Sequence, residues 1–116
     1  MLLDSDHTRI HHMIEAARQA LEYMQSRTRA DLDVDPPLQH LLVRDLEIIG
    51  EAASRVSRGL RAAHPEIPWR DLSDMRNRLI HAYFDIDLDI IWATAQTVLP
   101  ALASQLQALL NDPVEE

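Results

Sequence analysis

Apolar residues recur every three or four positions along most of the chain, which is the spacing of amphipathic helices. This pattern predicts an all-α, up-and-down bundle of four main helices with short connecting helical turns. The first main helix is expected to be capped by Asp4 or Ser5 and to end between Ser26 and Arg29. The others are expected at residues 35–59, from 68 to near 84, and from 87 to about 110.

Capping and helix-breaking residues set the expected ends of these helices. Asp35, which Pro36 follows, and Asp87 are typical N-cap residues. Gly59 is expected to weaken or end the second helix. The two prolines of residues 64–68 disfavour helix at the residues before them, so this stretch is expected to be a connector.

Two residues are expected to disturb the helices that contain them. Gly50 costs its helix up to about 1 kcal/mol relative to alanine, so close approach of another helix is a plausible compensation, with simple tolerance as the alternative. Pro100 removes one backbone hydrogen bond from the last helix. A kink is therefore expected there.

The last helix has no charged residue between Ile90 and Leu110. The Gln, Thr and Ser side chains in this run, together with Pro100, argue against a membrane span. Its apolar stripe is expected to face the core. A second face of small residues favours contact with another helix, so burial on two sides is expected; this face comprises Thr94, Thr97, Ala101, Ser104 and Ala108.

The length of 116 residues suits one helical domain over residues 1–116, and 47% apolar residues are enough for one core. The absence of cysteine excludes disulfides, thiolate nucleophiles and zinc-thiolate sites. The first residues lack the basic and apolar regions of a secretory signal. A cytoplasmic protein is therefore expected.

The net charge of −8 argues against tight nonspecific binding of nucleic acid, because such affinity comes mainly from cations that release counterions. Residues 55–81 differ from the rest of the chain, since they carry six arginines against three acidic residues. This local positive patch could steer a phosphate ligand. On charge alone, the favoured interpretation is ordinary solvated helix surface.

The residues with the clearest chemical potential are Arg76, Asn77, His81 and Tyr83. On an unbroken helix, Arg76 would share a face with Tyr83, and Asn77 would share a face with His81. Metal-independent RNA cleavage needs a base for the 2′-hydroxyl proton and a cation for the charge on phosphorus. Imidazole and guanidinium suit these roles, although a surface histidine near a structural arginine has the same spacing.

Arg76, His81 and Tyr83 match the Arg-x4-His-x-Tyr motif, and through it the chain resembles the HepT-like toxins of the HEPN superfamily. Residues 46–52, 64–70 and 87–92 also look like the pattern of that family. The resemblance covers residues 4 to about 110. Gly59 departs from it, because the family often has proline there.

The resemblance implies an endoribonuclease that needs no metal ion or other cofactor, with Arg76 and His81 as catalytic residues. It also implies a homodimer with paired sites, and a minimal nucleotidyltransferase as antitoxin. In this toxin class the motif tyrosine, here Tyr83, accepts AMP. Such a group would place negative charge beside Arg76, where the substrate phosphate would bind.

Three further residues are candidates for a supporting role. Asn77 could orient His81 or bind phosphate, or it could bond to the local backbone. Glu47 and Glu51 lie four residues apart on the second helix. They could hold Arg76 in place, or they could be an ordinary exposed pair.

Other candidate sites have simpler explanations. His7, His11 and Glu15 recur at four-residue spacing, but a solvated helix face explains this spacing, and no metal site is expected. Trp69 and Trp92 are expected to anchor the core or an interface rather than to stack on bases. The alternative function is a non-catalytic helical module that binds a nucleotidyltransferase partner or a nucleotide.

Overall fold

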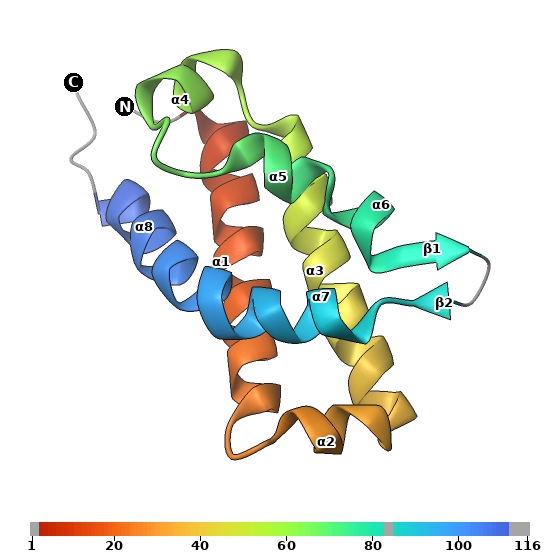
Figure 1. Ribbon diagram of the computed structural model, residues 1–116. Helices are drawn as coiled ribbons and strands as arrows, with labels where there is room; N and C mark the ends of the chain where they lie inside the picture. Colours follow the sequence, from red (N-terminus) through yellow and green to blue (C-terminus); the bar gives the residue numbers. More distant parts are fainter. Residues whose placement is uncertain (1–2, 83–84, 112–116) are drawn as a thin grey trace.

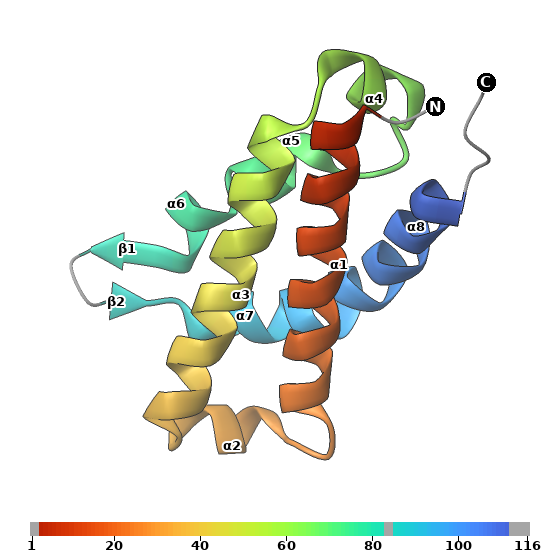
Figure 2. The ribbon, with the colours of Figure 1, turned by 180° about the vertical axis from the view of Figure 1, so that it is seen from behind.

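Two long antiparallel helices form the centre of the molecule. The computed structural model describes residues 3–82 and 85–111. Helix α1 (Asp4–Met24) and helix α3 (Pro36–Arg55) lie side by side (Figures 1 and 2), and the short helix α2 (Arg29–Asp33) connects them at one end. These two helices are the frame on which the rest of the chain packs.

The middle of the chain consists of short elements, and the helices at residues 69–73 and 75–79 pack on α3. Helix α4 (Arg58–Ala63) is followed by α5 (Trp69–Ser73) and α6 (Met75–Leu79). The chain then forms a small antiparallel ribbon of β1 (Ile80–Ala82) and β2 (Asp85–Ile86). This ribbon projects from one edge of the bundle (Figure 1).

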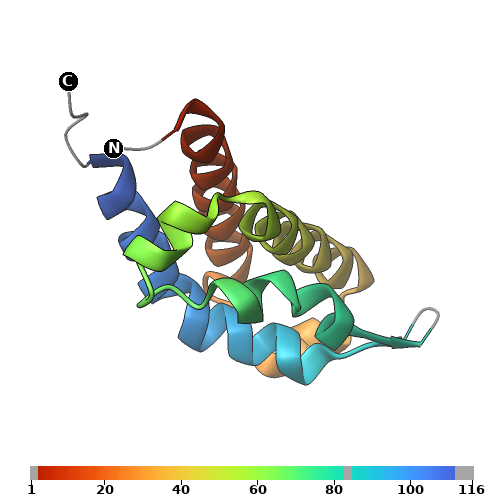
Figure 3. The ribbon, with the colours of Figure 1, turned by 90° about the horizontal axis from the view of Figure 1, so that it is seen from above.

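The last part of the chain is helical and packs against α1. Helix α7 (Leu88–Ala93) continues through a π-helical turn, η1 (Thr94–Val98), into α8 (Leu99–Asn111). Viewed along the bundle in Figure 3, α7 lies beside α6. The all-α class is therefore confirmed, with the β1–β2 ribbon as a small addition.

One cluster of buried apolar side chains joins the main helices, and its members alternate with polar residues at helical spacing. Ile10 and Ala17 contribute from α1, Leu46 and Ile49 from α3. The predicted inward stripe of the last helix is confirmed. Its fully or nearly fully buried members are Ile91, Ala95, Leu99, Leu102, Leu106 and Leu109.

Two of the predicted N-caps are confirmed. The carboxylate of Asp35 accepts a hydrogen bond from the Leu38 amide at 3.1 Å. The carboxylate of Asp87 accepts one from the Ile90 amide at 3.0 Å. These bonds satisfy amides that have no partner within a helix, which is why aspartate ends up at both positions.

The predicted cap of the first helix is wrong. Helix α1 begins at Asp4 itself, after Leu3, and no side chain caps it. Asp6 in its first turn is buried and instead accepts hydrogen bonds from the amide and hydroxyl of Ser57, at 2.8 and 2.6 Å. Asp6 therefore ties the start of α1 to the start of α4.

The predicted role of Gly59 as a helix end is also wrong. Helix α3 ends at Arg55, because Val56 adopts an extended conformation. Ser57 then caps a new helix through a hydrogen bond from the Leu60 amide to its hydroxyl. Gly59 lies inside this helix, α4, so the serine cap rather than the glycine determines the local structure.

The predicted third helix, from residue 68 to near 84, is broken into several pieces. The amide of Asp74 donates to the carbonyl of Arg70, which closes α5, and the Asn77 amide donates to the Asp74 carbonyl to open α6. Helix α6 ends at Leu79, because the following residues pair with β2. Antiparallel strand pairing between neighbouring segments thus overrides the helical spacing of these residues.

The predicted disturbance at Pro100 is present one turn earlier. A proline amide cannot donate to the carbonyl four residues before it, and the helix adopts π geometry over Thr94–Val98. The Leu99 amide donates to the Thr94 carbonyl, five residues back. The helix changes direction between α7 and α8 (Figure 1).

The predicted second buried face of the last helix is only partly covered within the single chain. Thr94 is buried, whereas Thr97, Ala101, Ser104 and Ala108 are exposed. Among the described helices, none is long and apolar enough to cross a membrane.

Candidate functional site

We call α5, α6 and the β1–β2 ribbon the motif segment. This segment is anchored to the bundle through α6. Met75 and Leu79 are buried at 5% and 0% exposure, and α6 packs on α3 and α7. The hydroxyl of Thr94 faces the Met75 sulfur at 4.0 Å. Asn77 and Arg78, between the two anchors, are exposed. Helix α6 therefore holds its polar residues at the surface by two apolar contacts.

A close backbone contact fixes this segment against α3. A Cβ atom added at Gly50 would lie 2.6 Å from the carbonyl oxygen of Leu72, which is closer than real Cβ atoms approach. The predicted close approach at Gly50 is therefore confirmed. Its partner is α5, which leads directly into α6, so this glycine sets the distance between α3 and the motif segment.

His81 lies at an irregularity of the β1–β2 ribbon. Ile80 pairs with Ile86 and Ala82 pairs with Asp85, so two steps along β1 match one step along β2. The extra residue on β1 is His81. The Asp87 amide closes the base of the ribbon by donating to the Leu79 carbonyl at 2.7 Å. Bulges of this kind occur frequently beside active sites.

The structure separates the motif residues that sequence reasoning placed on one helix. Arg76 belongs to α6 and His81 to β1. The predicted sharing of a helix face by Asn77 and His81 is therefore wrong, because α6 ends before His81. Tyr83, and the side chains of Arg76 and His81, lie outside what the structure describes.

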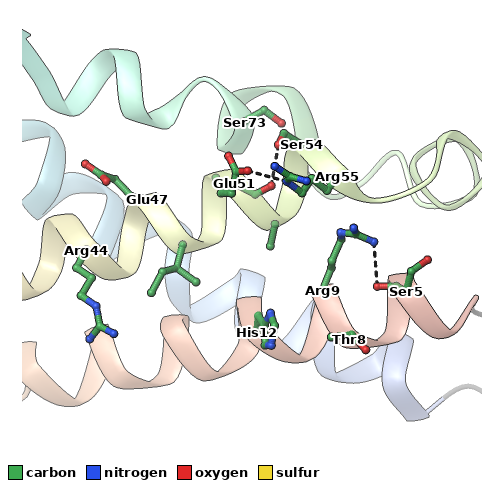
Figure 4. Close-up of a pocket in the computed structure, with 13 residues that line it drawn as sticks. Ser5, Thr8, Arg9, His12, Arg44, Glu47, Glu51, Ser54, Arg55 and Ser73 are labelled. Atoms are coloured by element: carbon green, nitrogen blue, oxygen red, sulfur yellow. Dashed lines mark hydrogen bonds and ion pairs between the residues drawn. The ribbon is translucent and has the colours of Figure 1, made fainter.

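The supporting candidates occupy the expected elements. Asn77 is exposed on α6. Glu51 forms an ion pair with Arg55, one turn along α3, at 2.6 Å. Glu47 is half-buried and extends from α3 toward the side on which α5 and α6 pack (Figure 4). The roles of all three residues remain predictions.

The structure also contains a groove that sequence reasoning did not find. It is about 800 Å³ in volume and lies between α1 and α3. We call it the α1–α3 groove. Its apolar floor consists of Ile48 and Ala52, and its polar rim includes Arg9, His12, Arg44 and Ser73. In Figure 4, Arg9 and His12 extend from α1 toward α3, and Arg44 extends from α3 toward α1.

Asp45 is a buried acid beside this groove, 1% exposed. Burial raises the pKa of its carboxyl group to about 6, although the positive charge of Arg44 opposes the shift. With the Gln19 amide oriented to satisfy its neighbours, its nitrogen donates to the Asp45 carboxylate at 2.7 Å and its oxygen accepts from the Tyr23 hydroxyl at 3.2 Å. Asp45 lies three residues after Leu42 and four before Ile49, so helical spacing places it on the buried face, and only its acidic side chain argued against burial.

The remaining candidates have structural roles. His11 lies 3.2 Å from Glu15 on the surface of α1, and among the described residues no group of three His, Asp or Glu side chains could hold a metal ion. Trp69 is buried and its indole donates to the His64 carbonyl at 2.9 Å, which confirms it as a core anchor. Trp92 is half-buried and packs against the core.

The positive stretch of residues 55–81 is partly neutralised. Arg55 pairs with Glu51, and Arg78 pairs with Asp71 at 3.3 Å. Among the described side chains, no carboxylate pairs with Arg58 or Arg70, and both are exposed. Arg58 on α4 and Arg70 on α5 are therefore exposed positive charges that no described carboxylate neutralises.

The fold and the site define a small helical-bundle protein that carries an arginine and a histidine at a junction between a helix and a bulged ribbon. The family model described as "Ribonuclease HepT-like" matches residues 13–109, which include the entire motif. The chain belongs to this family. The resemblance inferred from the motif is confirmed.

Curated relatives agree with this assignment. "Probable ribonuclease HepT" of Thermococcus cleftensis is 37% identical over 83% of this chain and 91% of that protein. A "Putative RNase" of Caldanaerobacter subterraneus is 34% identical over 88% of this chain and 91% of its own length. Another, from Methanocaldococcus jannaschii, is 33% identical over 68% of each chain. No solved structure matches the chain significantly.

Proposed function

We propose that this protein is an endoribonuclease that cleaves RNA without a metal ion. The observation that carries the proposal is family membership over a region that contains the whole Arg-x4-His-x-Tyr motif. The names of its relatives, which include ribonuclease and RNase, point the same way. The bulge at His81 adds local support, because it sets this residue apart from regular strand pairing.

In the proposed reaction His81 accepts the proton of a ribose 2′-hydroxyl, and the 2′ oxygen forms a bond to the adjacent phosphorus. The bond from phosphorus to the 5′ oxygen breaks, and that oxygen takes a proton from the imidazolium. Arg76 stabilises the additional negative charge on the phosphoryl oxygens. The products are a 2′,3′-cyclic phosphate and a 5′-hydroxyl. Asn77, Glu47 and Glu51 are proposed to position these two residues.

The test is incubation of purified protein with a mixed RNA pool in the presence of EDTA, beside His81→Ala. Cleavage by wild type and not by the variant is expected, because general acid–base catalysis contributes about 10²–10⁴-fold. Circular dichroism of His81→Ala should match wild type. Cleavage by His81→Ala at the wild-type rate would disprove the acid–base role, and inactivity of both would favour a non-catalytic module.

We further propose that the protein is the toxin of a two-component system in the cytoplasm. A minimal nucleotidyltransferase would act as antitoxin and transfer AMP to Tyr83. A phosphodiester there adds negative charge near the proposed position of Arg76, and so competes with substrate phosphate. After incubation with that enzyme and ATP, intact mass should show added adenylate on wild type and none on Tyr83→Phe. Equal labelling of both would move the site elsewhere.

The proposed assembly is a two-fold symmetric dimer. The exposed small residues Ala101, Ser104 and Ala108 on α8 support it, because small side chains let two helices approach closely. Pairing of two chains would also bring two motif segments into one assembly. Sedimentation at micromolar concentration should give a dimer. A monomer under these conditions, with intact cleavage activity, would disprove the assembly and leave the reaction in place.

A further inference from the structure

The α1–α3 groove has the size and chemistry of a ligand site, and it shares only the glutamates at positions 47 and 51 with the proposed reaction. Its volume of about 800 Å³ is within the range of small-molecule sites in proteins. The floor is apolar, formed by Ile48 and Ala52, and the rim carries arginines and a histidine. The hydroxyls of Thr8 and Ser73 also line it, and each already donates to a backbone carbonyl. An apolar floor with hydrogen-bond donors around it suits a nucleotide, which has a flat base and an anionic phosphate.

The charges in the groove favour an anion. Three arginines line it, at positions 9, 44 and 55, against two glutamates, at positions 47 and 51. Glu51 is already paired with Arg55. Among the described residues, the guanidinium of Arg9 donates to the Ser5 carbonyl alone, and no carboxylate pairs with Arg44. In Figure 4 these two guanidinium groups extend from opposite walls and lie toward opposite ends of the groove, with His12 between them.

The groove continues along the two helices. A second hollow of about 490 Å³ shares His12, Arg44 and Ile48 with it. Asp45 and Glu15 also line this second hollow, and the Asp45 carboxylate accepts a hydrogen bond from the Gln19 amide when that amide is oriented to satisfy its neighbours. An elongated cleft of this kind suits a strand rather than a single compact ligand.

The other edge of the groove leads to the motif segment. Ser73, which lines the groove, is the last residue of α5, and Arg76 follows three residues later in α6. Gly50, also in the lining, is where α3 and α5 touch. A strand in the groove would therefore extend toward the proposed site of cleavage.

We propose that the α1–α3 groove binds single-stranded RNA beside the cleaved bond, with Arg9 and Arg44 on its phosphates. The proposal rests on the proposed function, because it assigns the groove to the same substrate. Every cation of the chain is an arginine, and guanidinium binds phosphate through two parallel hydrogen bonds. The groove thus explains how an acidic protein with a net charge of −8 holds a polyanion.

The test measures binding without cleavage. A short fluorescein-labelled 2′-O-methyl RNA oligonucleotide of mixed sequence lacks the nucleophilic hydroxyl, so fluorescence anisotropy with the wild-type protein reports affinity alone. Arg44→Gln and Arg9→Gln should each weaken binding about tenfold, as expected for loss of one charge-assisted contact. The slope of log affinity against log salt should fall by about 0.7 for each variant.

Two matched variants control for net charge. Arg18→Gln removes the same charge from α1, but on its other side, where Arg18 donates to Gln107 of α8, so it should bind as wild type does. Glu47→Gln removes a carboxylate from the groove and should bind about twice as tightly. Thermal unfolding of all variants establishes that each is folded at the temperature of the measurement.

The outcomes separate the groove from the reaction. The proposal would be overturned if Arg18→Gln weakened binding as much as the groove variants do. It would also be overturned if Arg9→Gln and Arg44→Gln bound RNA as tightly as wild type. In either case, cleavage of the RNA pool would still test the proposed function independently. Arginine-dependent binding by a protein that cleaves no RNA would keep the groove and refute the reaction. If AMP binds with dependence on Arg44 and the oligonucleotide does not, the ligand is a free nucleotide and the proposal fails.

Discussion

The α1–α3 pair and the motif segment are built in opposite ways. Helices α1 and α3 are 21 and 20 residues long and share a continuous apolar seam. Helices α5 and α6 have five residues each, and the ribbon that follows has strands of three and two. Such short helices are unstable alone, so their position depends on contacts with the long pair. The candidate chemistry lies on the segment with the least local stability of its own.

The largest expected effect is on the motif segment and leaves the long pair intact. Arg76→Ala should lower the rate of RNA cleavage about 10²–10³-fold, the usual result of removing one group that stabilises transition-state charge. The free energy of unfolding should change little, because buried Met75 and Leu79 anchor α6. Rates on a labelled RNA and a urea titration provide the two measurements. A variant that loses stability and activity together would show that Arg76 is structural.

The contact between the two regions gives the next effect. Gly50→Ala should destabilise the protein by about 2–3 kcal/mol, because the new methyl would lie 2.6 Å from the Leu72 carbonyl oxygen and both atoms belong to packed helices. Urea unfolding measures this loss. Activity should also fall at temperatures where the variant is fully folded, since α5 must move away from α3. Unchanged stability would mean that the segment is not held at this point.

Within the long pair, Asp45 makes stability depend on pH. Its pKa is about 6 in the folded protein and ordinary in the unfolded chain, so the folded state binds more protons between about pH 4 and 6. The free energy of unfolding should therefore fall as pH rises through this window, by about 1–2 kcal/mol, since the Gln19 hydrogen bond partly stabilises the charged form. Asp45→Asn should remove this decline. If the free energy of unfolding changed with pH in the same way in wild type and Asp45→Asn, Asp45 would not be the cause of the decline.

The smallest effect concerns the second glycine. No described atom lies within 4 Å of a Cβ placed at Gly59, which is exposed in α4. Gly59→Ala should therefore stabilise the protein by about 0.5–1 kcal/mol, through the higher helix propensity of alanine. Together with Gly50→Ala it forms a pair in which the same substitution has opposite signs. If Gly59→Ala destabilised the protein as Gly50→Ala does, the gain in helix propensity expected at Gly59 would be contradicted.

The long helices were predictable because their signals are local. Apolar spacing placed α1 and α3, and Asp35 and Asp87 marked true helix starts. The close contact at Gly50 was also predictable, because a glycine inside a helix lowers the stability of that helix and a close approach of another helix can offset the loss. Helical spacing failed in the motif segment, where antiparallel pairing of Ile80 with Ile86 ends the helix. The two residues are only six positions apart, but helical periodicity contains no information about strand pairing.

The candidate site shows the same division. The motif residues were found from their identities and spacing, without knowledge of their backbone. The α1–α3 groove was not found, because Arg9 and Arg44 lie 35 positions apart and line one groove only when the two helices pack. Asp45 was missed for a different reason. Its spacing from Leu42 and Ile49 places it on the buried face, but an acidic side chain is seldom buried and was therefore not counted with the core.

The central claim is that this protein cleaves RNA through attack by the ribose 2′-hydroxyl. The most direct measurement uses a labelled RNA in EDTA, with analysis of the ends of the products, beside the same sequence made as DNA. The account predicts fragments with 2′,3′-cyclic phosphate and 5′-hydroxyl ends from RNA, and no cleavage of DNA. Intact RNA, or cleavage of DNA at the same rate, would contradict it.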